Sequence, residues 1–361
     1  MSSTWGDRLT ISIFGESHSG GIGVVMDGFP AGVAIDFDAV ARFMARRAPA
    51  GQAHATKRRE ADTPEVLSGI RDGVTCGTPI SCIIRNTDTR SQDYKNLSDT
   101  PRPGHADYTG RVRYGGYNDP RGGGHFSGRL TAPLVFAGAV CSHYLAKRGI
   151  AVGAHIAAIH GVLDTPFDMA AVDAHTLANV TAKPMPVLDD AAGARMLAEI
   201  EDARMTGDSV GGIVECAAVG LPAGLGDPMF HGVENEIASI VFGIPAVRGV
   251  EFGAGFAASE MTGSTHNDAF CIRDGEVKTE TNRHGGVLGG ITSGMPLIVR
   301  AAFKPTPSIA QTQQSVSLTD MTQCELAVHG RHDPCVVVRA LPCVEAAVMV
   351  ALTNILLKTV E

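Results

Sequence analysis

The sequence predicts an α/β protein in which two related βα layers pack into one unit. Apolar runs of strand length alternate with helical segments, and 43 Gly and 19 Pro are spread along 361 residues, which favours many tight turns. The motif Gly28–Gly32 (GFPAG) returns as Gly220–Gly224 (GLPAG). A second pair follows in the same order: Leu67–Ile70 with Pro79, and Leu288–Ile291 with Pro296.

Chance repetition of Gly/Pro turns is the alternative to this internal repeat. Hydrophobic residues make up 44% of the chain, which is enough for a large core. No Ser/Pro-rich linker divides the two halves. We therefore expect a single domain over residues 1–361.

The first half begins with strands and one capped helix. Asp36 can cap a helix over Phe37–Arg47, with Val40, Phe43 and Met44 on one face. Residues 86–130 show little periodicity, and so long an irregular stretch inside a compact chain is usually functional or disordered. Its Arg and aromatic residues favour function. Strands are expected at 9–14, 22–26 and 79–85.

The second half follows with longer helices. Thr131–Arg148 is expected to be helical, with Gly149 as its stop, and Asp190–Met205 forms a charged amphipathic helix. A hydrophobic helix is expected over Pro342–Lys358, with the proline near its start. Strands are expected at Gly211–Cys216, Val247–Phe252 and Pro296–Phe303.

The charge is unevenly placed. The net charge is −8, yet residues 1–150 carry an excess of basic side chains and residues 151–361 are acidic. A local excess of base within an acidic protein favours a focused anion site over a polyanion-binding surface. The eight Cys form no C-x-x-C pair, and neither a signal peptide nor an apolar run of transmembrane length is present. We expect reduced, mostly buried thiols and a cytoplasmic location.

The loop Gly15–Gly20 (GESHSG) directly follows a predicted strand. A strand-end loop that holds Glu16, Ser17 and His18 between glycines is a common position for a proton-transfer group. A turn in which Ser and His act only as caps is an equally good interpretation. A Ser–His nucleophile is disfavoured because the loop is not a G-x-S-x-G elbow.

A basic cluster lies between residues 39 and 59, where no acid occurs. Guanidinium groups bind phosphate and carboxylate oxygens two at a time. A solvated basic face is the alternative, and nucleic-acid binding a weaker one, since the protein is acidic overall. The members are Arg42, Arg46, Arg47, Lys57, Arg58 and Arg59.

Two Gly-rich segments extend the anion-binding pattern. Residues 102–108 (RPGHADY) and 121–129 (RGGGHFSGR) place Arg, His and Ser around glycines, just before a predicted helix. Glycines allow backbone N–H groups to approach an anion at a helix N-terminus. Neither a Walker loop nor G-x-G-x-x-G is present, so ATP and Rossmann-type NAD binding lose support. A flexible hinge is the alternative.

Two further loops carry titratable and hydroxyl groups. Lys304–Ser308 (KPTPS) follows a predicted strand, and Gly330–Cys335 (GRHDPC) pairs Arg with Asp, an arrangement that can keep a carboxylate ionised as a base. No spacing typical of a metal site accompanies His332 and Asp333, so no metal is predicted. Together these loops indicate an acid–base site for a polyanionic small molecule.

These motifs resemble the chorismate synthase family nearly end to end. The resemblance implies a β-α-β sandwich, usually a homotetramer, and a 1,4-anti elimination of phosphate from 5-enolpyruvylshikimate-3-phosphate. Chorismate forms in the last common step of aromatic amino-acid biosynthesis, and reduced FMN is required. The motifs are FGESH at 14–18, NTDTRSQDY at 86–94, RPGHAD at 102–107, RGGG at 121–124, SGR at 127–129, GG at 285–286, GGI at 289–291, KPT at 304–306 and GRHDPC at 330–335.

The resemblance also implies roles for individual residues. His18 would protonate the departing phosphate, His105 the reduced flavin, and Asp333 would assist removal of the ring proton. Ser17, Arg47 and Arg129 would bind substrate. NADPH enters only as an electron source, and an outside reductant is expected because no reductase domain is visible. The implied cofactor-binding residues are Arg47, His125, Phe126, Ser127, Pro245, Ala246, Gly289, Lys304, Pro305, Thr306, Pro307, Ser308 and Arg331.

The sequence departs from the family pattern at a few basic positions. Family members carry an Arg where this chain has Ala48. They carry a second anion-binding Arg where it has Ala53 or His54, depending on the alignment. His125 replaces an Arg beside the flavin phosphate. We hypothesise weaker binding of substrate or FMN, with a pH dependence from His125. A catalytically weakened FMN- or phosphate-binding relative is therefore the alternative function.

Overall fold

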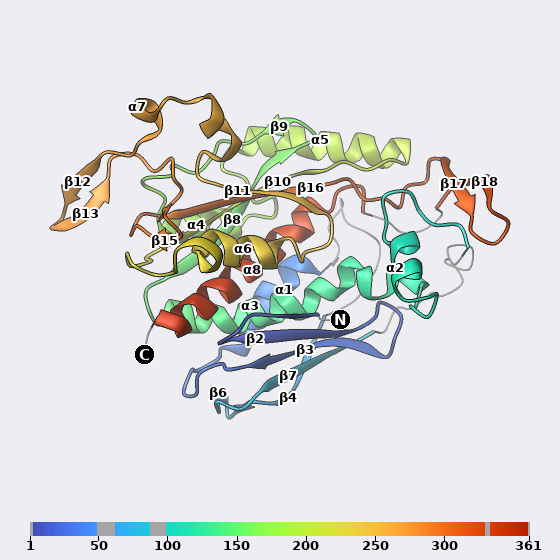
Figure 1. Ribbon diagram of the computed structural model, residues 1–361, viewed down its shortest axis with the longest axis horizontal. Helices are drawn as coiled ribbons and strands as arrows, with labels where there is room; N and C mark the ends of the chain where they lie inside the picture. The colour runs from blue at the N-terminus through green and yellow to red at the C-terminus, as the bar shows by residue number, and fades with distance from the viewer. Residues whose placement is uncertain (1–2, 49–61, 87–98, 329–332, 360–361) are drawn as a thin grey trace.

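The computed structural model describes residues 3–48, 62–86, 99–328 and 333–359. Two five-stranded antiparallel sheets enclose a layer of helices, and two more helices cover the outer face of the second sheet (Figure 1). The predicted α/β fold with its β-α-β sandwich is confirmed. The outer helical layer was not anticipated from the sequence.

The first sheet has the strand order β1-β2-β3-β7-β4. The apolar residues of its two central strands are buried against the helices, as alternation predicts; Ile22, Val24 and Met26 are fully buried. The strands are β1 (Thr4–Trp5), β2 (Thr10–Gly15), β3 (Gly21–Asp27), β4 (Pro64–Ser68) and β7 (Ile80–Arg85), with β5 (Ile70–Arg71) and β6 (Val74–Thr75) as a small separate hairpin.

The second sheet has the order β11-β16-β10-β8-β9. Helices α4 (Ala174–Thr181) and α5 (Asp190–Thr206) pack on its outer face beside β8. Asp189 caps α5 and Gly207 ends it in the left-handed conformation. The strands are β8 (Ala151–Ile159), β9 (Val162–Leu163), β10 (Gly212–Val219), β11 (Val247–Phe252) and β16 (Leu297–Phe303).

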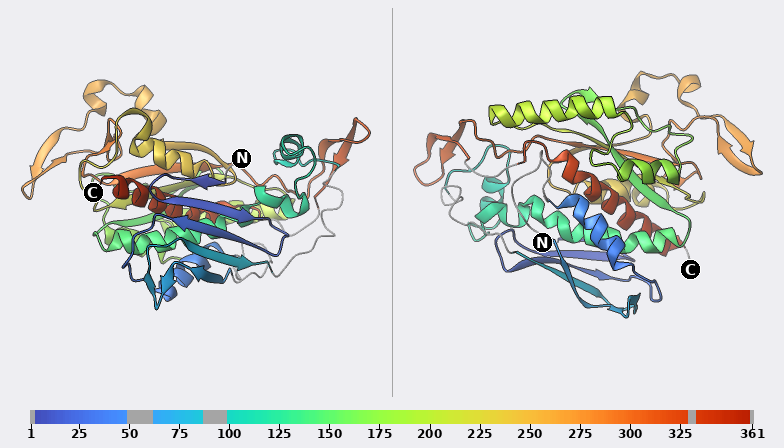
Figure 2. Two further views of the ribbon diagram at one scale, coloured as in Figure 1. Left: turned by 60° about the horizontal axis from the view of Figure 1, so that its bottom comes forward. Right: turned by 180° about the vertical axis from the view of Figure 1, so that it is seen from behind.

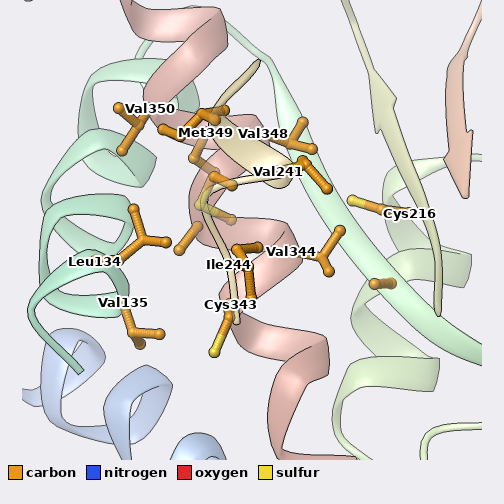
Figure 3. Close-up of a cluster of buried hydrophobic side chains, with 14 of the residues drawn as sticks. Leu134, Val135, Cys216, Val241, Ile244, Cys343, Val344, Val348, Met349 and Val350 are labelled. Atoms are coloured by element: carbon orange, nitrogen blue, oxygen red, sulfur yellow. The ribbon is translucent and has the colours of Figure 1, made fainter. Parts of the chain in front are cut away.

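The middle layer holds α1 (Phe37–Arg47), α3 (Thr131–Ala146), α6 (Val233–Val241) and α8 (Val337–Thr359). Side chains from α3, α6, α8 and β10 interdigitate in one apolar cluster (Figure 3). Helices α3 and α8 cross closely because Gly138 lacks a Cβ, which would lie 2.4 Å from Ala346. By length and composition α8 could cross a membrane, but 94% of its most apolar window is buried inside the protein. It is therefore the central core helix.

The internal repeat is visible in the hydrogen bonds of the two glycine–proline motifs. In the first half the Val33 amide donates to Thr75 Oγ1 at 3.0 Å. In the second half the Leu225 amide donates to Thr292 Oγ1 at 2.9 Å. Each threonine hydroxyl also donates to the proline carbonyl of its own motif. Chance similarity of turns does not produce the same bonds at both places, so the repeat is structural.

Further hairpins and several short elements lie outside the layers (Figure 2). Hairpin β12 (Phe270–Arg273) with β13 (Glu276–Thr279) and hairpin β17 (Gln313–Ser317) with β18 (Thr322–Leu326) project at opposite ends of the molecule (Figure 1). The remaining elements are α2 (Asp107–Arg113), α7 (Gly263–His266), the hairpin of β14 (Val287–Leu288) and β15 (Ile291–Thr292), and 3-10 turns η2 (Arg121–Phe126), η3 (Gly128–Leu130), η4 (Met229–His231) and η5 (Gly255–Glu260).

Two predictions about helices need correction. The last helix begins at Val337, so Pro342 lies inside α8 and not near its start. The packing of α8 against α3, α6 and the second sheet offsets the lost backbone hydrogen bond. Within the irregular stretch, α2 escaped notice because it is only seven residues long and contains Gly110. That glycine is required, since a Cβ there would lie 2.6 Å from the Phe126 ring.

Candidate active site

A cavity of about 560 Å³ opens where the two repeat halves meet, a size typical of small-molecule sites. Six of its lining side chains are cationic and one is an acid, Asp333. The cations come from both halves, although the excess of basic residues in the sequence lies within residues 1–150. They are Arg47, Arg102, Arg129, Arg248, Lys304 and Arg339.

Two of these arginines share one buried carboxylate. Arg47, the last residue of α1, and Arg129 in the turn before α3 both form ion pairs with Asp62, and all three side chains are buried. Arg47 also donates to Thr131 Oγ1 at 2.8 Å. The two guanidinium groups lower the pKa of Asp62, although burial acts in the opposite direction. Together, Arg47, Arg129 and Asp62 therefore carry one net positive charge.

The loop before α2 brings His105 to the cavity. Arg102 binds the Asp107 carboxylate through Nε at 2.7 Å and Nη2 at 2.8 Å, and Asp107 in turn contacts His105 Nδ1 at 2.6 Å. The Lys304 ammonium donates to the Gly104 carbonyl at 2.7 Å. Burial, followed by the nearby Arg248, lowers the pKa of Lys304. Neither Lys304 nor Arg248 has an ion pair within the part of the chain that the structure describes.

Three glycines separate His18 from His105. Gly122, Gly123 and Gly124 all have positive φ, between 54° and 86°. A Cβ on Gly122 would lie 2.2 Å from His18 Nδ1, and one on Gly123 would lie 3.1 Å from His105 Nε2. His18 is buried directly behind Gly122, which lines the cavity. The glycines are required because the backbone runs in contact with both imidazoles.

Asp333 approaches from the second half. Its carboxylate accepts a hydrogen bond from Arg339 Nη1 at 2.5 Å, and Arg339 Nε donates to the Arg47 carbonyl at 3.0 Å. Helix α8 thus connects the acid to the end of α1. The site combines two imidazoles, one carboxylate and an excess of cations, which suits acid–base chemistry on an anionic ligand.

Comparison with known proteins decides the family. A family model described as chorismate synthase matches residues 9–357. The chain belongs to the chorismate synthase family. A relative from Thermococcus gammatolerans named chorismate synthase is 48% identical over 354 residues, covering 98% of this chain and 97% of the relative. One from Korarchaeum cryptofilum is 45% identical over 357 residues, covering 99% and 98%.

A crystal structure of a chorismate synthase agrees in fold. It matches with a TM-score of 0.76 at 26% identity and covers 98% of this chain and 93% of that chain. These comparisons confirm the resemblance, the fold and the class of enzyme predicted from the sequence, a carbon–oxygen lyase of the shikimate pathway. They do not test the individual site residues.

The structure brings together most of the residues predicted from the chorismate synthase motifs. Ser17 lies buried beside His18, behind Gly122. Of the predicted residues, the cavity wall includes Arg47, His105, His125, Phe126, Ser127, Arg129, Pro245, Ala246, Lys304, Thr306, Pro307, Ser308 and Asp333.

Two described residues predicted to bind the cofactor, Pro305 and Gly289, are not in this wall. Pro305 is exposed beside Lys304, and Arg331 lies outside the described residues. Gly289 is exposed in the turn between β14 and β15, and β15 lies at the opposite end of the molecule from α2 (Figure 1). A turn at that end of the molecule does not line the cavity of its own chain.

The basic cluster of residues 42–59 does not converge as a unit. Arg42 is exposed, with Asp36 at 3.6 Å. Arg46 binds Glu345 of α8 with both terminal nitrogens, at 2.6 and 2.9 Å. Only Arg47 reaches the cavity, while Lys57, Arg58 and Arg59 lie outside the described residues. Because Arg46 and Arg47 point inward, the structure gives no support to a nucleic-acid surface on this helix.

The contacts of His125 bear on the hypothesis that this residue makes FMN binding pH-dependent. Its Nδ1 is 2.8 Å from the Gly15 carbonyl, which can only accept, and its Nε2 is 2.6 Å from Ser3 Oγ. Both ring nitrogens are therefore bound within the protein. These contacts favour a structural role for His125, and the pH dependence of FMN binding stays a prediction.

Sequence reasoning missed the acids behind the wall and two of the three cations that the second half contributes. Asp62, Arg248 and Arg339 belong to no motif that signalled chemistry. Asp107 was quoted within RPGHAD but was given no role. The only available signal was the spacing Arg102-x-x-His105-x-Asp107, which allows one short loop to join all three groups.

The cavity fits a flavin mononucleotide. Thr306 Oγ1 is buried without a hydrogen-bond partner among the described residues, on a loop that also presents Lys304 and Ser308. Gly128 leaves open space at the wall, with no atom within 4 Å of where a Cβ would be. Apolar groups such as Phe126 and Ile244 alternate with the cations. A flat ring with a polar, anionic tail suits this donor set.

Proposed function

We propose that this chain converts 5-enolpyruvylshikimate-3-phosphate to chorismate and phosphate, with reduced FMN held in the cavity. One observation carries the proposal: a single cavity unites His105 and Asp333 with six cations, and His18 lies directly behind its glycine wall. The substrate has one phosphate and two carboxylates. Its charge matches the excess of cations over acids in this wall.

The two ends of the cavity suit different anions. Arg47 and Arg129 already share Asp62 and leave one net charge, which suits a substrate carboxylate or phosphate that must later depart. Lys304 and Arg248 have no acid partner among the described residues and suit a permanently held phosphate such as that of FMN. Thr306, Ser308 and Ser127 would add hydroxyl contacts.

The chain's own residues supply proton transfer. His18 would deliver a proton toward the departing phosphate, His105 would hold one at the cavity edge, and Asp333 would accept the ring proton. Arg339 orients the Asp333 carboxylate by its hydrogen bond. Bound reduced FMN would supply an electron-rich partner beside the substrate, although the reaction has no net redox change.

The assembly and surroundings also remain proposals. We infer that the protein is a cytoplasmic homotetramer of single-domain subunits. An outside source would supply the electrons that reduce FMN, and NADPH would enter only as a possible reductant. The apolar hairpin β12–β13 supports oligomerisation, because Phe270 and Ile272 are 70% and 73% exposed. Gly289 would reach a cofactor only from a neighbouring copy.

An anaerobic assay tests the function. Protein, chemically reduced FMN and 5-enolpyruvylshikimate-3-phosphate are mixed, and phosphate and chorismate are followed together. Equal release of both products establishes the activity. FMN binding without products identifies the weakened relative, and no FMN binding contradicts the assigned cavity. Arg47→Ala should weaken substrate binding, while Arg42→Ala on the same helix serves as the matched control.

A further inference from the structure

The orientation of His105 depends on a carboxylate that the mechanism above does not use. Asp107 Oδ1 lies 2.6 Å from His105 Nδ1, and the side chains are 7% and 14% exposed. A carboxylate oxygen can only accept, so Nδ1 carries the hydrogen of this contact. The other ring nitrogen, Nε2, lies 3.1 Å from where a Cβ on Gly123 would be, and the His105 side chain forms part of the cavity wall.

Arg102 keeps Asp107 in its ionised form. Nε and Nη2 of the guanidinium bind the two carboxylate oxygens, and the Arg102 amide donates to Oδ2 at 3.0 Å. Burial alone would favour the neutral acid, but the hydrogen bonds from Arg102 and His105 lower the pKa of Asp107 well below its usual range. Asp107 is therefore a permanent acceptor for the imidazole.

The same arginine does not occupy the outward lone pair of His105. Arg102 Nη2 is 3.1 Å from Nδ1 and 3.3 Å from Nε2. An atom in line with the Nε2 lone pair would lie much farther from Nδ1, so Arg102 does not occupy that position. The lone pair of Nε2 is thus left for a partner in the cavity that His105 lines.

The loop that carries these groups is fixed at several points. Arg102 Nη1 donates to Ser308 Oγ at 3.0 Å, and Ser315 Oγ donates to the Pro101 carbonyl at 2.6 Å. Asp99, three residues before Arg102, accepts hydrogen bonds from the hydroxyls of Ser317 and Thr319 on hairpin β17–β18, at 2.8 and 2.6 Å. A loop held this firmly keeps the imidazole in one orientation.

We propose that Asp107 is a positioning residue that holds His105 as the Nδ1–H tautomer and so makes Nε2 the proton-transferring atom. Arg102 balances the charge of the carboxylate, so the imidazole does not face an uncompensated acid. The proposal rests on the proposed function, because it assigns the atom through which His105 acts. Asp107 itself is not among the residues that line the cavity.

Imidazole nitrogen NMR on flavin-free protein tests the tautomer directly. The protein is labelled at histidine ring nitrogens, and His105→Gln identifies the His105 signals. At neutral pH the neutral ring of the wild type should show a protonated Nδ1 and a bare Nε2. Asp107→Ala should shift the signals toward the Nε2–H form, which free histidine prefers. An unchanged tautomer in a folded Asp107→Ala protein would overturn the proposal.

Steady-state kinetics provide a second readout. Asp107→Ala should lower kcat by about 10- to 1,000-fold with a much smaller change in KM, as expected for a lost orienting carboxylate. Asp107→Glu should recover part of kcat and of the Nδ1–H signal. If Asp107→Ala does not fold, Asp107→Glu and Asp107→Asn replace it, and a wild-type tautomer and kcat in both contradict the proposal.

Asp99→Asn is the matched control in the same loop. Its carboxylate holds the hairpin and makes no contact with the imidazole, so the wild-type tautomer should persist even where thermal stability falls. A tautomer shift in Asp99→Asn equal to that in Asp107→Ala would show loop loosening and would overturn the specific role of Asp107. If the wild-type protein has no activity at all, the proposed function fails while the tautomer measurement still stands on its own.

Discussion

Two histidines of this protein bind carboxylates in opposite settings. His105 lies at the cavity, with Asp107 bound to Nδ1 and Arg102 within hydrogen-bond distance of the ring nitrogens. His155 on β8 is fully buried in the second sheet, and both its ring nitrogens contact acids, Asp164 and Glu215, at 2.8 Å. No Lys or Arg pairs with the His155 cluster within the described residues.

The difference distinguishes a histidine that can reach a ligand in a cavity from one that is bound entirely within the protein. His155 lies between two acids, and their hydrogen bonds raise its pKa although burial acts to lower it. Because both ring nitrogens of His155 are bound to acids, neither is available for proton exchange with a ligand. His105 keeps one nitrogen toward a cavity, and its acid is balanced by a guanidinium. Both histidines therefore bind a carboxylate, and they differ in what the second ring nitrogen contacts.

The largest effect on turnover should come from removing His105. His105→Ala should lower turnover by about 10²- to 10⁴-fold, because a positioned proton-transfer group is lost. Single-turnover kinetics with reduced FMN measure it. The denaturant midpoint should stay close to wild type, since the ring lies at the cavity edge. Turnover within threefold of wild type would remove His105 from the mechanism.

Removing His155 from its buried cluster should lower stability and leave FMN binding unchanged. His155→Ala leaves the Asp164 and Glu215 carboxylates buried without their partner, which should lower the free energy of unfolding by about 3–5 kcal/mol. Urea unfolding measures the loss. FMN affinity of the protein that remains folded should be unchanged. A variant as stable as wild type would contradict a charged His155 in the core.

The pH dependence of stability should separate the two clusters. The pKa of folded His155 lies above the ordinary value of 6.5, so its stabilisation is complete below that value and is lost as the pH rises through the folded pKa. Asp107 has a lowered pKa, so its contribution is present above 3.8 and is lost only in acid. Raising the pH above 7 should thus destabilise wild type more than His155→Gln. Parallel melting curves for the two proteins would oppose this account.

The smallest effect is expected from an exposed ion pair. Arg42 and Asp36 are 3.6 Å apart with side chains 71% and 57% exposed. Solvent screens such pairs, so Arg42→Ala should change neither the melting temperature nor substrate binding measurably. Arg47→Ala, one turn further on, removes a buried partner of Asp62 and should change both. Equal behaviour of the two variants would show that burial does not distinguish them.

Much of the fold could be predicted because local patterns and packing agree. The helix over Phe37–Arg47 has the predicted ends, since Asp36 accepts the Asp38 and Ala39 amides as its cap. Strand β11 also has the predicted bounds. The proline in α8 was misplaced, because the local rule puts proline in the first turn whereas packing on three neighbours sustains a helix around it.

The sequence by itself determined the α/β class, the family, and the set of histidines, glycines and acids from which a site could be built. Those follow from short-range order: side-chain periodicity, caps and motifs of a few residues. Only the tertiary structure decided that Arg46 turns to Glu345 while Arg47 turns to Asp62, and that His155 is structural. Charges pair with whatever the fold brings within a few ångströms, and that partner can lie far along the chain, as Glu345 does from Arg46.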